Sequence, residues 1–416
     1  MSSPQGPHKG AGKWWSGLDP ESLLVMILVG VIGVYSISIS GILPILMTSW
    51  ATSPGMNVRL AGYVATLNSV GAGLGQFAAV FLLTRFAVSR LVGFGIAVSV
   101  LCDVGCIFVH GAEWLALLRL FSGFGHGFIL VAVTNWLARL ERADRGFGAF
   151  MLLQVVFISP MIMAVPYVQS LIGPPAPYVL LLVLAAISAA FTPLLNLNGG
   201  DVPVKRVAPA TVPARRALPR TVIVYWFLAV SAPTLFAIAV MGPWIYLQLF
   251  GMSLGHPEAL LSQVLAAVTL AGIPASLFLM WLGNRIGRVI PTLVSLIGII
   301  MSIVVFLFGP PSIASYAFGT TVFTVAWCFI TPYLQAIQSD LDRSGRLAAA
   351  ANLPVTIGSA LGPAVFAFML GNGGYRAAFF VSIAFFVASL VAALIPAFAA
   401  DRVNGTASLA LPHAAV

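Results

Sequence analysis

Long apolar runs, separated by short polar breaks, follow one another along the whole chain. A helix needs about 20 apolar residues, at about 1.5 Å each, to cross a hydrocarbon core of about 30 Å. Runs of this length satisfy their backbone hydrogen bonds in lipid as helices, because barrel strands are about half as long. The pattern therefore predicts an all-α integral membrane protein with twelve transmembrane helices. They cover residues 22–48, 60–83, 91–109, 114–137, 146–172, 177–195, 221–250, 259–282, 289–308, 313–337, 347–370 and 377–399.

The composition indicates the same class of protein. Of the 416 residues, 60% are hydrophobic and 7% are charged, whereas about a quarter of the residues in soluble domains are charged. This excludes a single soluble core and a disordered chain. The three cysteines, Cys102, Cys106 and Cys328, lie inside apolar runs and predict neither a disulfide framework nor a metal site. The first run is too long for the core of a cleaved signal peptide, so we expect a retained helix.

Basic residues occupy every second break. All but three of the 20 Lys and Arg residues fall on one side of the predicted membrane; the exceptions are Arg59, Arg119 and Arg376. Cytoplasmic loops carry the excess of Lys and Arg, so we expect both termini in the cytoplasm and the chain in the cytoplasmic (inner) membrane. The net charge of +9 then reflects topology and contact with anionic lipid headgroups, and it predicts no nucleic-acid partner.

The longest break lies at the middle of the chain and is rich in Gly, Pro and basic residues, which is typical of a flexible linker. Thr84-Arg85 follows the second run and Asn284-Arg285 follows the eighth, which indicates duplicated halves. Duplicated halves around a midplane site are a recurring plan in transporters. We expect a cytoplasmic tail over 1–20, a six-helix bundle over 21–197, a cytoplasmic linker over 198–220, a second six-helix bundle over 221–400 and a cytoplasmic tail over 401–416.

Short motifs in both halves resemble those of the major facilitator superfamily. Its loop G-x-x-x-D-R-x-G-R-R follows the second span of each half. In the second half of this chain the loop has an asparagine at the acidic position, and in the first half a threonine stands there. The matching segments are Asn284-Arg285-Ile286-Gly287-Arg288, Thr84-Arg85, Arg119-x-x-x-Gly123-x-Gly125-x-Gly127 in the fourth span, Gly358-x-x-x-Gly362-Pro363 in the eleventh, Gly41-Ile42-Leu43-Pro44 and Ala61-Gly62-Tyr63.

With twelve spans and a central linker, these motifs identify the chain as similar to the arabinose-efflux-like and drug-exporting branch of that superfamily. The resemblance implies two six-helix bundles that alternate access to a midplane site. The acids of both loops are missing, which departs from the family's usual charge latch. Of the fifth-span antiporter motif G-x-x-x-G-P-x-x-G-G, Pro160 alone remains, so exchange against protons rests on the branch resemblance. The resemblance implies conformational-switch loops at Arg85, Asn284, Arg285, Gly287 and Arg288.

Three ionisable side chains lie inside spans and away from their ends: Asp103, Arg119 and His126. Such groups are costly in lipid and indicate functional sites. Asp103 and Arg119 both lie roughly 8–10 Å below the outer edge of their spans, so an ion pair between neighbouring helices would make each tolerable. Three interpretations stay open: a pair that holds two helices in register, a gating or proton-coupled pair that breaks in one conformation, and two residues that never meet.

His126 lies near the bilayer midplane, on the same helix face as Arg119 and nearly two turns after it. Histidine exchanges a proton near neutral pH, which predicts a proton carrier. The alternative is a neutral imidazole that is hydrogen-bonded to a neighbouring helix.

Glycines recur at four-residue spacing in several spans. This spacing lets helices approach closely. We expect a role in helix packing for Gly123, Gly127, Gly358 and Gly362.

Candidates for substrate contacts are polar and aromatic residues in the spans that, by resemblance, line the family's central cavity, and in their neighbours. The first span carries no carboxylate, and the fourth carries Arg119 and His126. A permanently cationic cargo is therefore not favoured, and a neutral polar or weakly anionic molecule fits better. The predicted substrate-binding residues are Tyr35, Asn68, Asn135, Gln154, Tyr246, Trp327, Gln335 and Asn352.

The favoured function is a secondary active transporter that exports a small organic molecule, of sugar, drug or siderophore type, in exchange for protons. The first alternative is a proton-coupled importer of an organic anion, and a distant one is a membrane sensor or scaffold that transports nothing. We predict no enzyme, catalytic residue, cofactor or metal, because no nucleophile–base pair, metal cluster or phosphate loop occurs in the sequence. The expected partners are a small-molecule substrate, protons and the lipid bilayer, and we expect a monomer.

Overall fold

The computed structural model describes residues 17–109, 111–141, 143–197, 220–282, 285–341 and 346–409, and these are almost entirely helical. The helices begin where the sequence offers a cap: Ser22 accepts a hydrogen bond from the Val25 amide, and Asn57 accepts one from the Leu60 amide. In chain order the elements are α1 Leu23–Gly41, α2 Leu43–Ala51, α3 Val58–Leu82, α4 Val88–Phe108, α5 Ala112–Leu137, α6 Ala143–Ile172, α7 Ala176–Phe191, the 3₁₀ helix η1 Thr192–Asn196, α8 Arg220–Ser253, α9 Glu258–Leu282, α10 Val289–Phe308, α11 Ile313–Leu341 and α12 Arg346–Leu409.

Eleven helices of the described residues are long and apolar enough to cross a membrane. The last of these segments, Leu353–Arg402, has 50 residues, which at about 1.5 Å each is more than twice the thickness of a hydrocarbon core. It is two crossings, because Gly374 interrupts it with φ 70° and ψ −171°, a backbone conformation open to glycine. The first crossing is also broken, at Ile42, where α1 gives way to α2. The predicted fold class of twelve transmembrane helices is thus confirmed.

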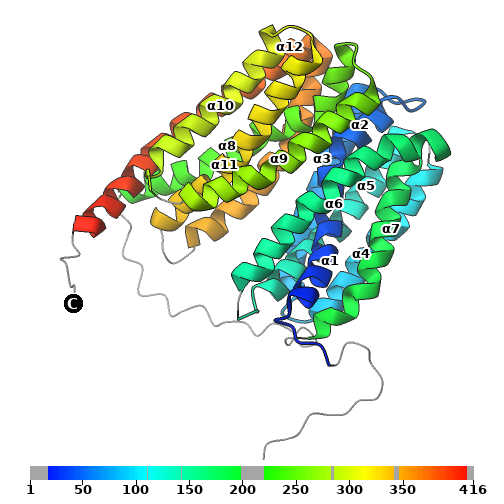
Figure 1. Cartoon of the computed structure of the whole chain (residues 1–416), viewed down its shortest axis with the longest axis horizontal. Coiled ribbons are helices and arrows are strands. Elements are labelled where there is room, and N and C mark those ends of the chain that lie inside the picture. Colours follow the sequence, from blue (N-terminus) through cyan, green and yellow to red (C-terminus); the bar gives the residue numbers. More distant parts are fainter. Residues whose placement is uncertain are drawn as a thin grey trace, which may run out of the picture.

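The helices form two groups, and each group follows one half of the sequence (Figure 1). Helices α1–α7 make the first half, in which α5 packs against α3 and α4. Helices α8–α12 make the second half, in which α12 packs along α8 and α10 packs along α11. The two halves meet through α3 with α12, α6 with α9, and α2 with α8.

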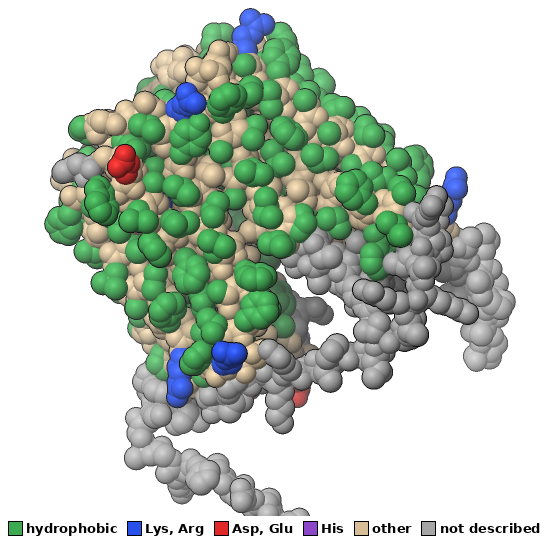
Figure 2. Space-filling view, turned by 180° about the vertical axis from the view of Figure 1, so that it is seen from behind, with side chains coloured by type: hydrophobic (Ala, Val, Ile, Leu, Met, Phe, Trp, Pro, Cys, Tyr) green, Lys and Arg blue, Asp and Glu red, His purple; other side chains and the backbone are tan. Residues whose placement is uncertain are grey.

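Apolar side chains cover the flanks of both halves, as Figure 2 shows, and the visible Lys and Arg residues lie toward the ends. Leu101, Phe108 and Phe227 are 73%, 74% and 70% exposed. Exposure of this kind over a whole flank is unfavourable in water and favourable in hydrocarbon, so these flanks are the lipid-facing surface.

Glycines bring α3 and α5 into backbone contact. A Cβ atom on Gly123 would collide with the carbonyl oxygen of Asn68, and one on Gly127 with that of Ala72. The second half repeats this between α12 and α8, where a Cβ on Gly358 or Gly362 would lie 2.6 or 2.7 Å from a carbonyl oxygen of α8. All four glycines that we assigned to packing therefore lie where two helix backbones approach closely.

Candidate functional site

Two buried charges lie on neighbouring helices of the first half. Asp103 on α4 and Arg119 on α5 form an ion pair, and neither side chain is exposed. The hydroxyl of Ser122 donates a second hydrogen bond, of 3.0 Å, to the same carboxylate oxygen of Asp103. The pair thus forms between neighbouring helices, as two of our three interpretations require.

His126 continues this cluster one turn further along α5. Its Nδ1 atom lies 2.8 Å from the carbonyl oxygen of Ser122 and 3.3 Å from the hydroxyl of Ser99 on α4. Tyr35 on α1 places its ring 4.8 Å from the imidazole, centroid to centroid. We call Tyr35, Ser99, Asp103, Arg119, Ser122 and His126 the charge cluster.

Aromatic side chains close the other end of the charge cluster. The Arg119 guanidinium lies 5.2 Å from the ring centroid of Tyr178 on α7, which is within the range of a cation–π interaction. The Tyr178 hydroxyl in turn accepts a 2.7 Å hydrogen bond from the indole nitrogen of Trp50 on α2. Four helices of the first half therefore hold the ion pair in place.

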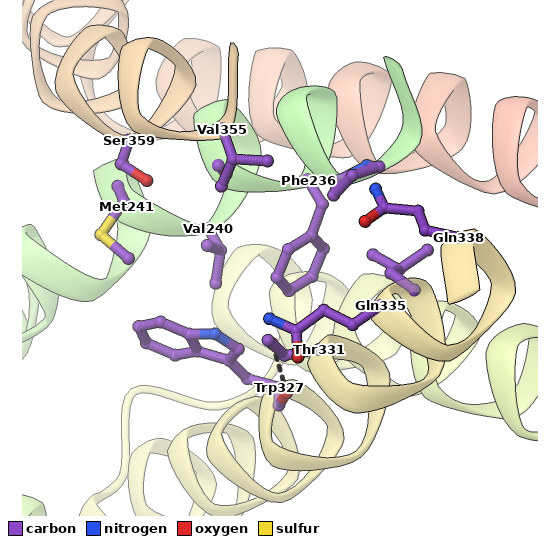
Figure 3. A pocket seen from close by; sticks show the side chains of 12 residues that line it. Phe236, Val240, Met241, Trp327, Thr331, Gln335, Gln338, Val355 and Ser359 are labelled. Carbon is purple, nitrogen blue, oxygen red and sulfur yellow. Dashed lines mark hydrogen bonds between the residues drawn. The ribbon is translucent and has the colours of Figure 1, made fainter. Parts of the chain in front are cut away.

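A cavity of about 220 Å³ lies in the second half, among α8, α11 and α12 (Figure 3). Trp327, Thr331, Gln335 and Gln338 of α11 line one wall. Gln338 donates a 2.9 Å hydrogen bond to the carbonyl oxygen of Ala229, whereas Gln335 is exposed. The remaining lining residues are Pro233, Phe236, Ala237, Val240, Met241, Leu334, Val355 and Ser359.

A sequence model of the Major Facilitator Superfamily matches residues 25–353. The chain belongs to this superfamily. Its fold is similar to that of a crystal structure of the nucleoside transporter NupG, with 14% identity, a TM-score of 0.66 and coverage of 90% of this chain and 98% of that chain. It is also similar to the peptide transporter POT in complex with sulfate, with 15% identity, a TM-score of 0.72 and coverage of 92% and 95%. No curated protein matches the chain by sequence.

The superfamily fold separates the predicted substrate-binding residues into several places. Trp327 and Gln335 line the cavity of the second half, and Tyr35 belongs to the charge cluster. Asn68 is buried, and its side-chain oxygen has no partner among the described residues. Asn135 accepts a hydrogen bond from Arg139, and Gln154 is half-buried beside Met151. Asn352 lies in α12, in a stretch whose side chains the structure does not describe.

Tyr246, the remaining predicted contact, joins the two halves. We call the end of the helices at which residues 197 and 220 lie the linker side, and the other end the far side. The Tyr246 hydroxyl of α8 donates a 3.1 Å hydrogen bond to the carbonyl oxygen of Val58 in α3. Trp244 donates to Ser40 at 3.3 Å, also between the halves and toward the far side. Figure 1 shows the halves together at that side and diverging toward the linker side.

Replacing Tyr246 by phenylalanine should favour opening of the far side about fivefold, because one hydrogen bond between the halves contributes about 1 kcal/mol. Distances between spin labels at Thr52 and Ser253, two exposed positions on the far side, measure the opening. Tyr316→Phe is the matched control, since that hydroxyl donates a 3.1 Å hydrogen bond to Leu247 inside the second half. A label distance that shifts equally in both variants would contradict the assignment.

The loop of the second half for which the resemblance implies a switch role contacts two acids that the sequence analysis missed. Gly287 has φ +73°, and the amides of Arg288 and Val289 donate hydrogen bonds of 2.7 and 3.1 Å to the carboxylate of Asp401. Arg288 also pairs with Asp340 at 2.8 Å. Carboxylates from α11 and α12 therefore contact this loop, whose own acidic position carries an asparagine.

The other switch-loop residues have fewer contacts. Arg85 is exposed between α3 and α4, and the Arg285 guanidinium lies 4.7 Å from the ring centroid of Trp281. Asn284 lies outside the described residues. A sequence signal for Asp340 and Asp401 did exist, because both are acids at span ends on the side where basic residues gather.

Proposed function

We propose that this member of the superfamily is a secondary active transporter that exports a small organic molecule by alternating access, coupled to proton entry. One observation carries the proposal: a cavity with hydrogen-bonding groups lies in one half, a buried charge cluster lies in the other, and the halves join toward one side. Closing the linker side while opening the far side would move the cavity from one compartment to the other.

The chemistry of the cavity favours an uncharged, polar cargo. Its described lining holds two glutamines, a threonine, a serine and an indole, and no ionisable side chain. Arg119, the cation that suggested an anionic cargo, pairs with Asp103 instead of facing this cavity. We therefore favour a sugar-like, drug-like or siderophore-like neutral molecule over an organic anion.

The position of the cavity favours export. It is lined by α11 from Trp327 to Gln338, which is the part of that helix nearer to its linker-side end at Leu341. The basic breaks assign the linker side to the cytoplasm, so the conformation described here would load cargo from the cytoplasm. In this proposal the monomeric chain resides in the inner membrane with both termini in the cytoplasm.

The test is transport by proteoliposomes under an imposed pH gradient. Radiolabelled arabinose, uridine, chloramphenicol, dialanine and citrate serve as a panel of neutral and anionic probes. We expect gradient-driven flux of at least one neutral probe, and His126→Gln should slow it about tenfold or more while exchange at equal pH continues. His256→Gln is the matched control, because His256 lies in the break between α8 and α9. The proposal would be contradicted if no probe is transported, or if citrate alone is transported.

A further inference from the structure

A second cavity, of about 260 Å³, lies on the far side of the first half. Its rim consists of residues in the breaks between α2 and α3, between α4 and α5, and between α6 and α7, among them Ser53, Pro54 and Pro174. It shares no lining residue with the cavity of the second half. The first half therefore has its own opening, apart from the space proposed for cargo.

The floor of this far-side cavity touches the charge cluster. Tyr178 lines the cavity, and its ring lies 5.2 Å from the Arg119 guanidinium. Cys106 also lines the cavity and lies about one turn after Asp103 on α4. A single layer of side chains thus separates the cavity from the Asp103–Arg119 pair.

Among the described residues, several buried polar atoms of the charge cluster have no hydrogen-bond partner. They are one carboxylate oxygen of Asp103, the Nε and Nη1 atoms of Arg119, the Tyr35 hydroxyl and the Nε2 atom of His126. Asp103, Arg119, Tyr35 and His126 are each at most 1% exposed. Buried polar atoms in proteins are almost always satisfied, often by ordered water. So many unsatisfied atoms beside a cavity indicate a route for water.

Hydrogen bonding also fixes which nitrogen of His126 is basic. The carbonyl oxygen of Ser122, 2.8 Å from Nδ1, can only accept a hydrogen bond. Nδ1 therefore carries the hydrogen, and Nε2 holds the free lone pair. Among the described residues, the ionisable groups around this histidine are Tyr35 from α1, Asp103 from α4 and Arg119 from α5. Cys102 from α4 and Tyr178 from α7 lie beyond them, on the side of Arg119.

We propose that the far-side cavity is a proton inlet: it carries water to the Asp103–Arg119 pair and lets a proton reach Nε2 of His126 without passing through the cargo cavity. A hydronium ion from the far side gives up its proton, water remains, and the imidazole becomes an imidazolium. The face of Tyr35 and the carboxylate of Asp103 stabilise the added charge. The proposal deepens the proposed function, since it rests on proton coupling, and it places protons and cargo in different halves.

Thiol labelling tests the inlet without any cargo. In a Cys102→Ser/Cys328→Ser chain, reconstituted in liposomes, Cys106 should react with the membrane-impermeant cation MTSET added to the far side and not with reagent on the linker side. Ser53→Trp places a large side chain at the rim and should slow labelling at least tenfold. If the Ser53→Trp protein does not fold, Pro174→Trp tests the same point and should slow labelling equally. Thr52→Trp, next to the rim but outside the lining, should change it less than twofold. Labelling that is absent, or that comes from the linker side, would overturn the proposal.

The protonation of His126, followed by NMR, tests the proton step directly. In sealed liposomes with ¹⁵N-labelled histidine, the ring signal that His126→Gln removes should respond when the far-side pH is lowered, and Ser53→Trp should abolish that response. A ring that follows linker-side pH, or that does not titrate, would overturn the inlet. Both measurements are free of cargo, so they can fail while the transport panel succeeds, and the reverse also holds.

Discussion

Replacing Arg119 by methionine is expected to destabilise the folded protein by about 3–5 kcal/mol. The variant leaves the Asp103 carboxylate buried with a hydrogen bond from Ser122 and without its cation. A buried charge that loses its partner keeps the full cost of its desolvation, whereas the attraction that offset this cost is gone. Unfolding in mixed micelles with increasing SDS, followed by tryptophan fluorescence, measures the difference.

A double-mutant cycle measures how much of the stability depends on the interaction between Asp103 and Arg119. Asp103→Leu together with Arg119→Met removes both charges, and should recover most of the stability that Arg119→Met alone loses. Arg90→Gln is the matched control, because Arg90 is exposed at the start of α4 and its loss should change stability by about 0.5 kcal/mol or less. A double variant as unstable as the single one would show that the charges do not depend on each other.

The second large expected effect is the loss of stability when a methyl group is added where α3 and α5 cross. In Gly123→Ala, the new Cβ would overlap the carbonyl oxygen of Asn68, so the two helix backbones must separate. Overpacking of this kind costs about 1–3 kcal/mol, and we expect the upper part of that range because backbone cannot rotate away as a side chain can. The thermal midpoint of the purified protein and its yield in the membrane fraction both report the loss.

Gly93→Ala provides the matched control on α4. A Cβ atom on Gly93 meets nothing within 4 Å, and alanine favours a helix over glycine by about 0.5–1 kcal/mol. The same substitution should therefore leave stability unchanged or raise it at Gly93, and lower it at Gly123. Equal effects at both positions would mean that the close crossing is not what Gly123 provides.

The crossings could be predicted from sequence because the hydrocarbon thickness sets their length and the charges set their ends. The similar depth of Asp103 and Arg119 followed from the same arithmetic, and the structure brings the two together. Two details of the backbone were not predictable in this way. The break at Ile42 and the continuation of α12 through Gly374 depend on local backbone geometry, which hydrophobicity does not record.

The candidate site was harder to predict because each residue's role depends on which helix its face meets. Tyr246 and Trp327 are both aromatic residues in predicted spans, yet Tyr246 bonds across the halves and Trp327 lines a cavity. Asp401 and Gly287 are far apart in sequence, so their contact had no local pattern. Ser122 could have been predicted from sequence, because it lies between Arg119 and His126 on the same face of α5.

Among the described residues, the wall of the proposed cargo cavity is formed by α8, α11 and α12, and this has an evolutionary consequence. Mutations selected for a new or broader range of compounds should accumulate on these three helices, where they can reshape the wall one side chain at a time. The charge cluster of the other half would stay unchanged under such selection. Under the proposed function, a lineage of this protein could thus change what it expels while keeping the same source of energy.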